Sequence, residues 1–401
     1  MTASGFDLSP LIQLMVLGAV IALAPLAWVW LRHRGQSPAR RLRALTLLTL
    51  FLTFDLVLFG AFTRLSDSGL GCPDWPGCYG HASPVGAQAP IALAQQALPD
   101  GPVTPAKAWI EMLHRYMATG VGVLILTLLA ARWRERRNSQ GLPGLGWPAV
   151  TLLAVSVQGA FGALTVTMKL FPVIVTLHLM GGLSLLALLT VQATRYDNAV
   201  LGTEPTAVGR GLQLSLLGVG LLLAGQIALG GWVSTNYAVL ACQDFPECQN
   251  SWWPEMNFQQ GFTLWRELGL TAAGDAIAFS ALTAIHYVHR LAAYVVLLAL
   301  VGLAWRLHQV KGLRRQARCL AALAVIQLLT GLGNVLLGWP LAAALAHTGG
   351  AAAMVMVMVW ALSSCRVGST SHANANANTA AHDNNGRQPA TSSRQRSESI
   401  A

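Results

Sequence analysis

Long apolar runs separated by short polar stretches occupy the chain up to about residue 363. Each run approaches or exceeds the roughly 20 residues that an α-helix needs to cross the hydrocarbon core of a bilayer. The pattern predicts nine membrane-spanning helices, at residues 11–31, 44–63, 110–131, 146–167, 172–193, 211–235, 274–305, 318–338 and 341–363. The first run lacks a preceding basic segment and a small-residue cleavage site, so we interpret it as a retained helix.

Composition agrees with this pattern. Hydrophobic residues make up 54% of the chain and charged residues only 10%, which is too little polarity to cover a soluble globule. The formal net charge of +10 does not indicate a nucleic-acid partner, because most Lys and Arg residues lie in four connections, 32–43, 132–145, 194–210 and 306–317. Basic connections mark the cytoplasmic side, so we expect the N-terminus outside and the C-terminus in the cytoplasm.

Two long connections, 64–109 and 236–273, are predicted to lie on the outer side and share a pattern. Residues 60–78 align without gaps on residues 230–248, with both cysteines matched. Further along, three more pairs of positions match: His-Arg at 114–115 and 289–290, Gln at 158 and 327, and His at 178 and 347. These matches predict an all-α integral membrane protein with two tandem four-helix transmembrane bundles related by an internal parallel repeat, plus one extra N-terminal transmembrane helix.

Four regions follow from this interpretation. Residues 1–43 form the extra N-terminal helix and a basic cytoplasmic loop, residues 44–200 the first four-helix bundle, and residues 201–365 the second. Residues 366–401 are mainly Asn, Ala, Ser and Thr with scattered Arg, and they cannot bury enough apolar area to fold. We expect them to be a disordered cytoplasmic tail.

The cysteines of the outer connections are spaced alike, Cys72 with Cys78 and Cys242 with Cys248. A six-residue spacing is long for a zinc site, and an oxidising compartment favours one disulfide in each loop over a metal site or free thiols. A redox role for these pairs stays open.

Four histidines lie inside predicted spans at matched positions: His114, His178, His289 and His347. A membrane histidine can simply hydrogen-bond to a neighbouring helix. Two matched pairs instead favour ligation of haem iron by one histidine from each of two helices.

Charged residues accompany these histidines. Arg115 and Arg290 are candidates for pairing with haem propionates, and the alternative is that they reach toward the membrane interface. Glu111 lies one turn before His114, whereas the second copy has His286 at that place. Glu111 is therefore a candidate proton acceptor or acid, and its alternative role is an ion pair with Arg115.

The motifs resemble those of the haem A synthase family of bacteria and mitochondria. The resemblance covers about residues 44–363 and rests on the segments 60–78, 111–115, 176–178, 286–290 and 347–350. It implies an oxidoreductase that acts on a CH group of haem O. The enzyme converts the C8 methyl group, through a hydroxymethyl intermediate, to the formyl group of haem A, which terminal oxidases need. Members have eight helices, so the span at 11–31 departs from the family.

The resemblance also implies roles for individual residues. His289 and His347 would ligate the iron of a haem b cofactor in the second bundle, with Arg290 as a propionate candidate. In the first bundle His114 and His178, with Arg115, would bind the substrate haem O, and Glu111 would be catalytic. The cysteine pairs Cys72–Cys78 and Cys242–Cys248 match the outer-loop pairs of members that have both.

The expected surroundings follow from the same resemblance. The chain is expected to be a multi-pass protein of a bacterial plasma membrane that contributes to cytochrome oxidase assembly. Expected partners are the lipid bilayer, a haem O synthase, an electron-transfer partner and further copies of the chain itself.

Two other functions use similar residues. A di-haem b-type membrane cytochrome passing electrons from quinol needs the same four histidines but gives Glu111 no task. A transporter can also be built from a parallel repeat, but it needs no axial ligands.

Overall fold

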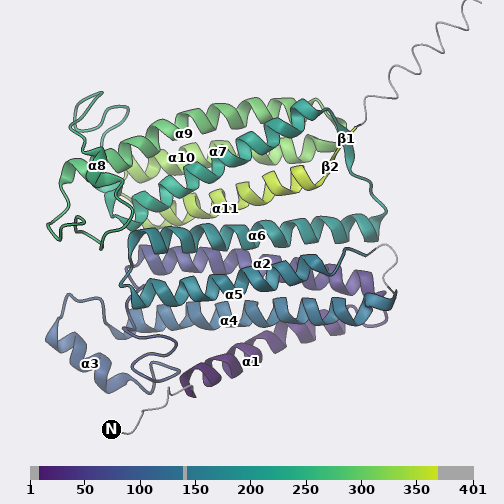
Figure 1. Cartoon of the computed structure of the whole chain (residues 1–401), viewed down its shortest axis with the longest axis horizontal. Coiled ribbons are helices and arrows are strands. Elements are labelled where there is room, and N and C mark those ends of the chain that lie inside the picture. The colour runs from purple at the N-terminus through teal and green to yellow at the C-terminus, as the bar shows by residue number, and fades with distance from the viewer. Residues whose placement is uncertain (1–8, 139–141, 369–401) are drawn as a thin grey trace, which may run out of the picture.

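A computed structural model describes residues 9–138 and 142–368 (Figure 1). Within these residues nine helices are long and apolar enough to cross a membrane, so the nine predicted spans are confirmed. These helices are α1 (Ser9–Arg32), α2 (Pro38–Leu65), α4 (Pro105–Arg134), α5 (Gly146–Thr167), α6 (Pro172–Leu201), α7 (Arg210–Thr235), α9 (Phe279–His308), α10 (Arg314–Leu336) and α11 (Leu341–Ser363).

Local sequence explains several helix ends. Pro38, Pro105 and Pro172 each occupy a first helical position, where the missing N–H would have had no intrahelical acceptor. The side chain of Thr104 caps α4 by accepting from the backbone N–H of Lys107 at 3.2 Å. Gly202 ends α6 with a left-handed φ of 66°.

The long helices form two sets that lie side by side (Figure 1). We call α2, α4, α5 and α6 the first helix set, and α7, α9, α10 and α11 the second helix set; within each set, neighbouring helices pack against one another. Helix α6 joins the sets by packing against α7 and α11, and α1 packs on α4 from outside. The internal repeat itself stays a prediction.

Short elements occupy the connections. Helices α3 (Gln88–Ala97) and α8 (Phe258–Gly261) lie at one end of the molecule, with the 3-10 turn η2 (Ala238–Ala241). The opposite end holds two further 3-10 turns, η1 (Glu135–Asn138) and η3 (Lys311–Leu313), and the strands β1 (Thr206–Val208) and β2 (Cys365–Val367).

The strand pair bears on the predicted tail. Strands β1 and β2 are parallel, with Thr206 opposite Cys365. Arg366 and Val367, which we expected to begin a disordered tail, are therefore hydrogen-bonded to the connection before α7. The remainder of that predicted tail, from residue 369 onward, lies outside the described residues, as do residues 1–8.

Candidate functional site

The predicted histidine pairs come together from different helices. His114 on α4 and His178 on α6 are close enough for their imidazoles to interact electrostatically. His289 on α9 and His347 on α11 form the equivalent pair in the second helix set. All four side chains are half-buried. Each helix set thus presents one imidazole from each of two helices.

Each imidazole lies against a glycine of a neighbouring helix. A Cβ atom at that glycine would press on the ring, so no larger residue fits without displacing the imidazole. The distances from that Cβ position to the imidazole Cε1 are 2.9 Å for Gly60 and His114, 3.3 Å for Gly162 and His178, 3.0 Å for Gly230 and His289, and 3.3 Å for Gly331 and His347.

In each pair, a glutamine on the neighbouring helix binds the backbone carbonyl of the second histidine. The Nε2 of Gln158 donates to the carbonyl oxygen of His178 at 2.6 Å, and the Nε2 of Gln327 donates to that of His347 at 2.9 Å. This crosslink holds neighbouring helices in register, α5 with α6 and α10 with α11.

The pairs differ at Nδ1, the imidazole nitrogen that is not needed for ligation through Nε2. In the second helix set the hydroxyl of Thr330 donates to the carbonyl oxygen of Ile326 at 2.7 Å. Its oxygen is therefore free to accept from Nδ1–H of His347, 2.9 Å away. The Nε2 of Gln226 lies 3.1 Å from Nδ1 of His289 and also donates to the carbonyl oxygen of His289 at 3.1 Å. An amide N–H can only donate, so Gln226 gives Nδ1–H of His289 no acceptor. The contact with Thr330 selects the tautomer in which Nε2 of His347 can bind a metal.

In the first helix set Nδ1 of His114 and Nδ1 of His178 are buried and have no hydrogen-bond partner among the described residues. The places that match Gln226 and Thr330 hold Leu56 and Phe161, which cannot accept a hydrogen bond through their side chains. Instead Phe59 stacks on His114, with ring centroids 6.4 Å apart and planes at 10°. The sequence comparison identified the histidines but missed this difference in their supports.

These residues fit a haem in each helix set. Haem iron takes an axial ligand on each face, which a pair of imidazoles from two helices supplies. In residues 9–138 and 142–368 no cluster of three or more His, Cys, Asp or Glu side chains is arranged to hold a metal ion.

Glu111 is buried beside the first pair, with 4% of its surface exposed. Its Oε1 accepts from Nη2 of Arg115 at 2.5 Å, and its Oε2 accepts from the backbone N–H of Cys72 at 2.8 Å. The ion pair that the spacing suggested is therefore present. A carboxylate with these two partners is also held in one orientation, one helical turn from His114. His286, at the matched place, is buried and its Nδ1 has no partner in the described structure.

The two arginines hold the loops that contain the paired cysteines. Nη1 of Arg115 donates to the carbonyl oxygens of Asp74 at 3.0 Å and Gly77 at 2.5 Å. Arg290 donates to the carbonyl oxygen of Glu247 at 3.0 Å and also to that of Asp244. Both arginine side chains are buried, so neither reaches out to the membrane interface. A contact with a haem propionate would compete with these loop carbonyls.

The cysteine pairs close the loops that the arginines hold. The Sγ atoms of Cys72 and Cys78 are 2.13 Å apart, and those of Cys242 and Cys248 are 1.98 Å apart, which are disulfide distances. In the first loop the carboxylate of Asp74 also accepts from the backbone N–H of Tyr79 at 2.6 Å. Burial, and then the charge of Asp74, raise the pKa of the Tyr79 phenol.

A polar bridge joins the two helix sets at the end of the molecule that carries the disulfide-closed loops. Arg64, at the end of α2, donates to the carbonyl oxygen of Ser234 at 2.6 Å and lies 4.0 Å above the ring of Tyr237. The Tyr237 hydroxyl donates to the carboxylate of Asp67 at 2.5 Å. Burial raises the pKa of Tyr237 above its ordinary value, Arg64 opposes that shift, and Asp67 adds to it.

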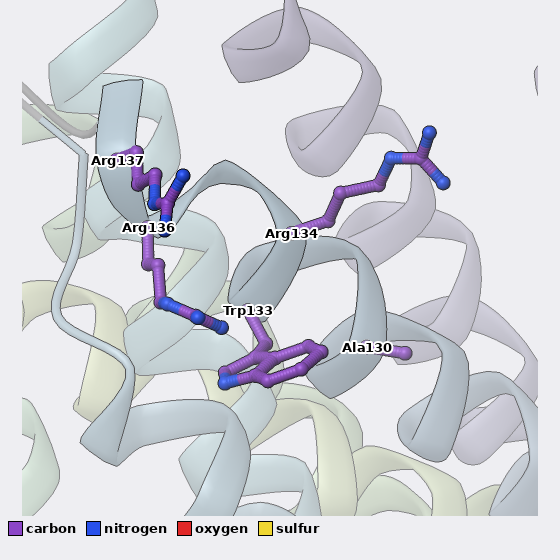
Figure 2. Close-up of a pocket in the computed structure, with 5 residues that line it drawn as sticks. All are labelled: Ala130, Trp133, Arg134, Arg136 and Arg137. Atoms are coloured by element: carbon purple, nitrogen blue, oxygen red, sulfur yellow. The ribbon is translucent and has the colours of Figure 1, made fainter.

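A pocket of about 450 Å³ lies at the opposite end of α4, lined by Ala130, Trp133, Arg134, Arg136 and Arg137 (Figure 2). Arg136 stacks over Trp133 at 4.2 Å. Roughly 24 Å of helix separates this pocket from His114, so it belongs to the basic end of the molecule and not to the histidine site.

The fold and the site define a class: a multi-pass helical membrane protein with two paired-histidine sites below disulfide-closed loops. Residues 43–359 match the family described as cytochrome oxidase assembly protein (COX15-CtaA), and the chain belongs to that family.

Three bacterial relatives carry the name heme A synthase. The protein of Shewanella oneidensis is 38% identical over 312 residues, which cover 78% of this chain and 93% of the relative. That of Rhizorhabdus wittichii is 27% identical over 353 residues, covering 82% and 96%. That of Methylobacterium sp. is 29% identical over 374 residues, covering 86% and 98%.

Proposed function

We propose that this chain is a haem A synthase, which oxidises the C8 methyl group of haem O, through a hydroxymethyl intermediate, to the formyl group of haem A. Relatives named heme A synthase support this proposal. The observation that supports different roles for the two helix sets is the contrast at Nδ1. The Thr330 hydroxyl can accept from Nδ1–H of His347, whereas Nδ1 of His114 and Nδ1 of His178 have no hydrogen-bond partner among the described residues.

The second helix set is proposed to keep a resident haem b. Ligating imidazoles commonly donate Nδ1–H to a neighbour, which fixes the ring and strengthens the ligand. Thr330 gives His347 such an acceptor. A haem b held by His289 and His347 would supply one-electron redox chemistry in the membrane.

The first helix set is proposed to bind the substrate haem O. Imidazoles without Nδ1 support are weaker ligands, which suits a haem that must enter as substrate and leave as product. Glu111 is the proposed catalytic residue. Conversion of a methyl to a formyl group removes hydrogen and electrons from carbon and adds one oxygen atom, which water can supply. The electrons would pass to the electron-transfer partner, and a positioned carboxylate can accept a proton. Arg115 and Cys72 orient that carboxylate.

The proposed location is a bacterial plasma membrane, with the disulfide loops outside and the arginine-rich ends in the cytoplasm. The clustering of Lys and Arg in connections at one end supports this orientation. A haem O synthase and an electron-transfer protein are the proposed partners, because the site needs a supply of haem O and an outlet for electrons. Self-association of the chain is a further proposal.

Expression in a bacterium that makes haem O but lacks its own haem A synthase tests the function. Haem extracted from the purified protein would be identified by mass. We expect haem b together with haem O, its alcohol or haem A. Haem b alone would favour a di-haem cytochrome passing electrons from quinol, and absence of any haem would contradict both functions.

A further inference from the structure

A second pocket of about 450 Å³ lies between α9 and α10, away from both histidine pairs. Its floor consists of small alanines, among them Ala317 and Ala324, which are buried. Its walls are large apolar side chains that stay exposed, including Leu298 and Trp305 at 75% and 68%. The pocket is therefore a groove that opens on the outer surface of the helix bundle.

The polar end of this groove is basic. His308 at the end of α9 and Arg318 near the start of α10 line it, and both are exposed. Neither forms a salt bridge in the part of the chain described. The Nε of Arg318 donates to the carbonyl oxygen of Arg314 in the same helix at 3.4 Å, and this oxygen carries no formal charge. Its charge is therefore available to an anionic group.

The length of the groove matches one leaflet of a membrane. Its lining on α9 extends from Leu297 to His308, which is roughly 16 Å at the helical rise. The hydrocarbon core of a bilayer is about 30 Å thick, so each leaflet contributes about 15 Å. The apolar part thus ends near mid-membrane, and the basic part lies where lipid headgroups begin.

We propose that the α9–α10 groove is a binding site for one phospholipid with a net negative headgroup, taken from the leaflet on the basic side. An acyl chain fills the space above the alanine floor, and Arg318 and His308 bind the headgroup phosphate. Guanidinium groups bind phosphate through paired hydrogen bonds. Basic pockets between transmembrane helices on the cytoplasmic side suit anionic headgroups.

Two other occupants fit less well. A transmembrane helix of a second copy would need an apolar surface across the whole bilayer, and this groove covers about half of it. A quinone that exchanges electrons with a haem at His289 would have its polar end too far away, since roughly 28 Å of helix separates His289 from His308.

Native mass spectrometry of the full chain, purified in detergent, tests the proposal. Phosphatidylglycerol, phosphatidylethanolamine and inorganic phosphate would be titrated separately. We expect one phosphatidylglycerol to bind about tenfold more tightly than phosphatidylethanolamine, and inorganic phosphate not to compete at equal concentration. Equal binding of both lipids would overturn the anionic preference. Competition by free phosphate would show that the site takes an ion and not a lipid.

Two variants locate the lipid. Arg318→Gln should lower the phosphatidylglycerol affinity by about tenfold, and Ala321→Phe, which fills the groove, should abolish the retained lipid. Lys311→Gln and Leu329→Phe are controls, because both side chains are exposed nearby and neither lines the groove. Unchanged lipid binding in both groove variants would overturn the site. A dimer mass that Ala321→Phe removes would instead assign the groove to a second copy.

Discussion

The two helix sets surround their histidines with the same framework and then differ in two details. In both, a glycine faces each imidazole, a glutamine binds a histidine carbonyl, and an arginine holds a disulfide-closed loop. The second set adds the Thr330 hydroxyl, which can accept from Nδ1–H of His347. The first set instead places Glu111 where the second has His286.

In the proposed function, this difference distinguishes the helix set that binds a resident haem from the helix set that acts on a substrate haem. The shared framework would position a haem between two imidazoles, and it consists of glycines beside the imidazoles and hydrogen bonds to backbone carbonyls. Support at Nδ1 strengthens a permanent ligand. A buried carboxylate with two fixed partners offers proton chemistry instead. We therefore propose that the chemistry takes place in the helix set that has Glu111 and lacks a hydrogen-bond partner at its imidazole Nδ1 atoms.

Replacing Glu111 should give the largest effect. Glu111→Gln keeps the shape and can still accept the N–H of Cys72, but it cannot take up a proton. We expect haem A yield to fall by about 100-fold or more, while haem b content stays unchanged. Haem A per protein, measured after extraction, checks this. His286→Gln is the matched control, and a wild-type yield from Glu111→Gln would remove the catalytic role.

Removing the support of His347 should have the next largest effect. Thr330→Val deletes the acceptor for Nδ1–H, and loss of such outer contacts weakens metal binding by about 10-fold to 100-fold. We expect faster transfer of haem b to an apo-globin and a shifted reduction potential. Thr165→Val is the control, because Thr165 binds only the carbonyl oxygen of Gly162 in its own helix. Equal haem loss from both variants would mean that Thr330 acts through helix packing.

Opening the loop closed by Cys72 and Cys78 should lower the haem A yield more than the haem b content. The backbone N–H of Cys72 binds Glu111, so Cys72→Ser with Cys78→Ser should let the carboxylate shift and lower haem A yield by about tenfold. The loop closed by Cys242 and Cys248 has no glutamate to orient, and opening it should change the yield less. Haem A yield at equal haem b content compares the two double variants, and equal losses would refute the link to Glu111.

Removing the Tyr237 hydroxyl from the bridge between the helix sets should give the smallest effect. The size of this effect should depend on pH. Because the pKa of Tyr237 is raised in the folded protein, its contribution to stability is fully present below the unfolded value of about 10 and is lost as pH rises through the folded pKa. Tyr237→Phe should cost about 1 kcal/mol. Thermal unfolding of the wild-type protein and of Tyr237→Phe from pH 8 to 11 measures the cost of the substitution and its pH dependence. The difference in stability between the two proteins should shrink toward pH 11.

The nine spans could be predicted because a run of about 20 apolar residues rarely forms anything but a membrane-spanning helix. The histidine pairs followed from matched positions. Thr330 was missed because a threonine in an apolar span usually bonds its own helix, and Thr330 does that as well. The loop carbonyls that Arg115 binds could not be predicted, since backbone acceptors leave no mark in the sequence.

The contrast between the helix sets is tested most directly by the haem content of two single variants, His178→Ala and His347→Ala, purified side by side. Extraction and mass identification would report which haem each retains. We expect that His178→Ala keeps haem b but contains no haem O or haem A, and that His347→Ala loses haem b. Loss of haem b from His178→Ala with retention in His347→Ala would contradict the proposed division between the helix sets.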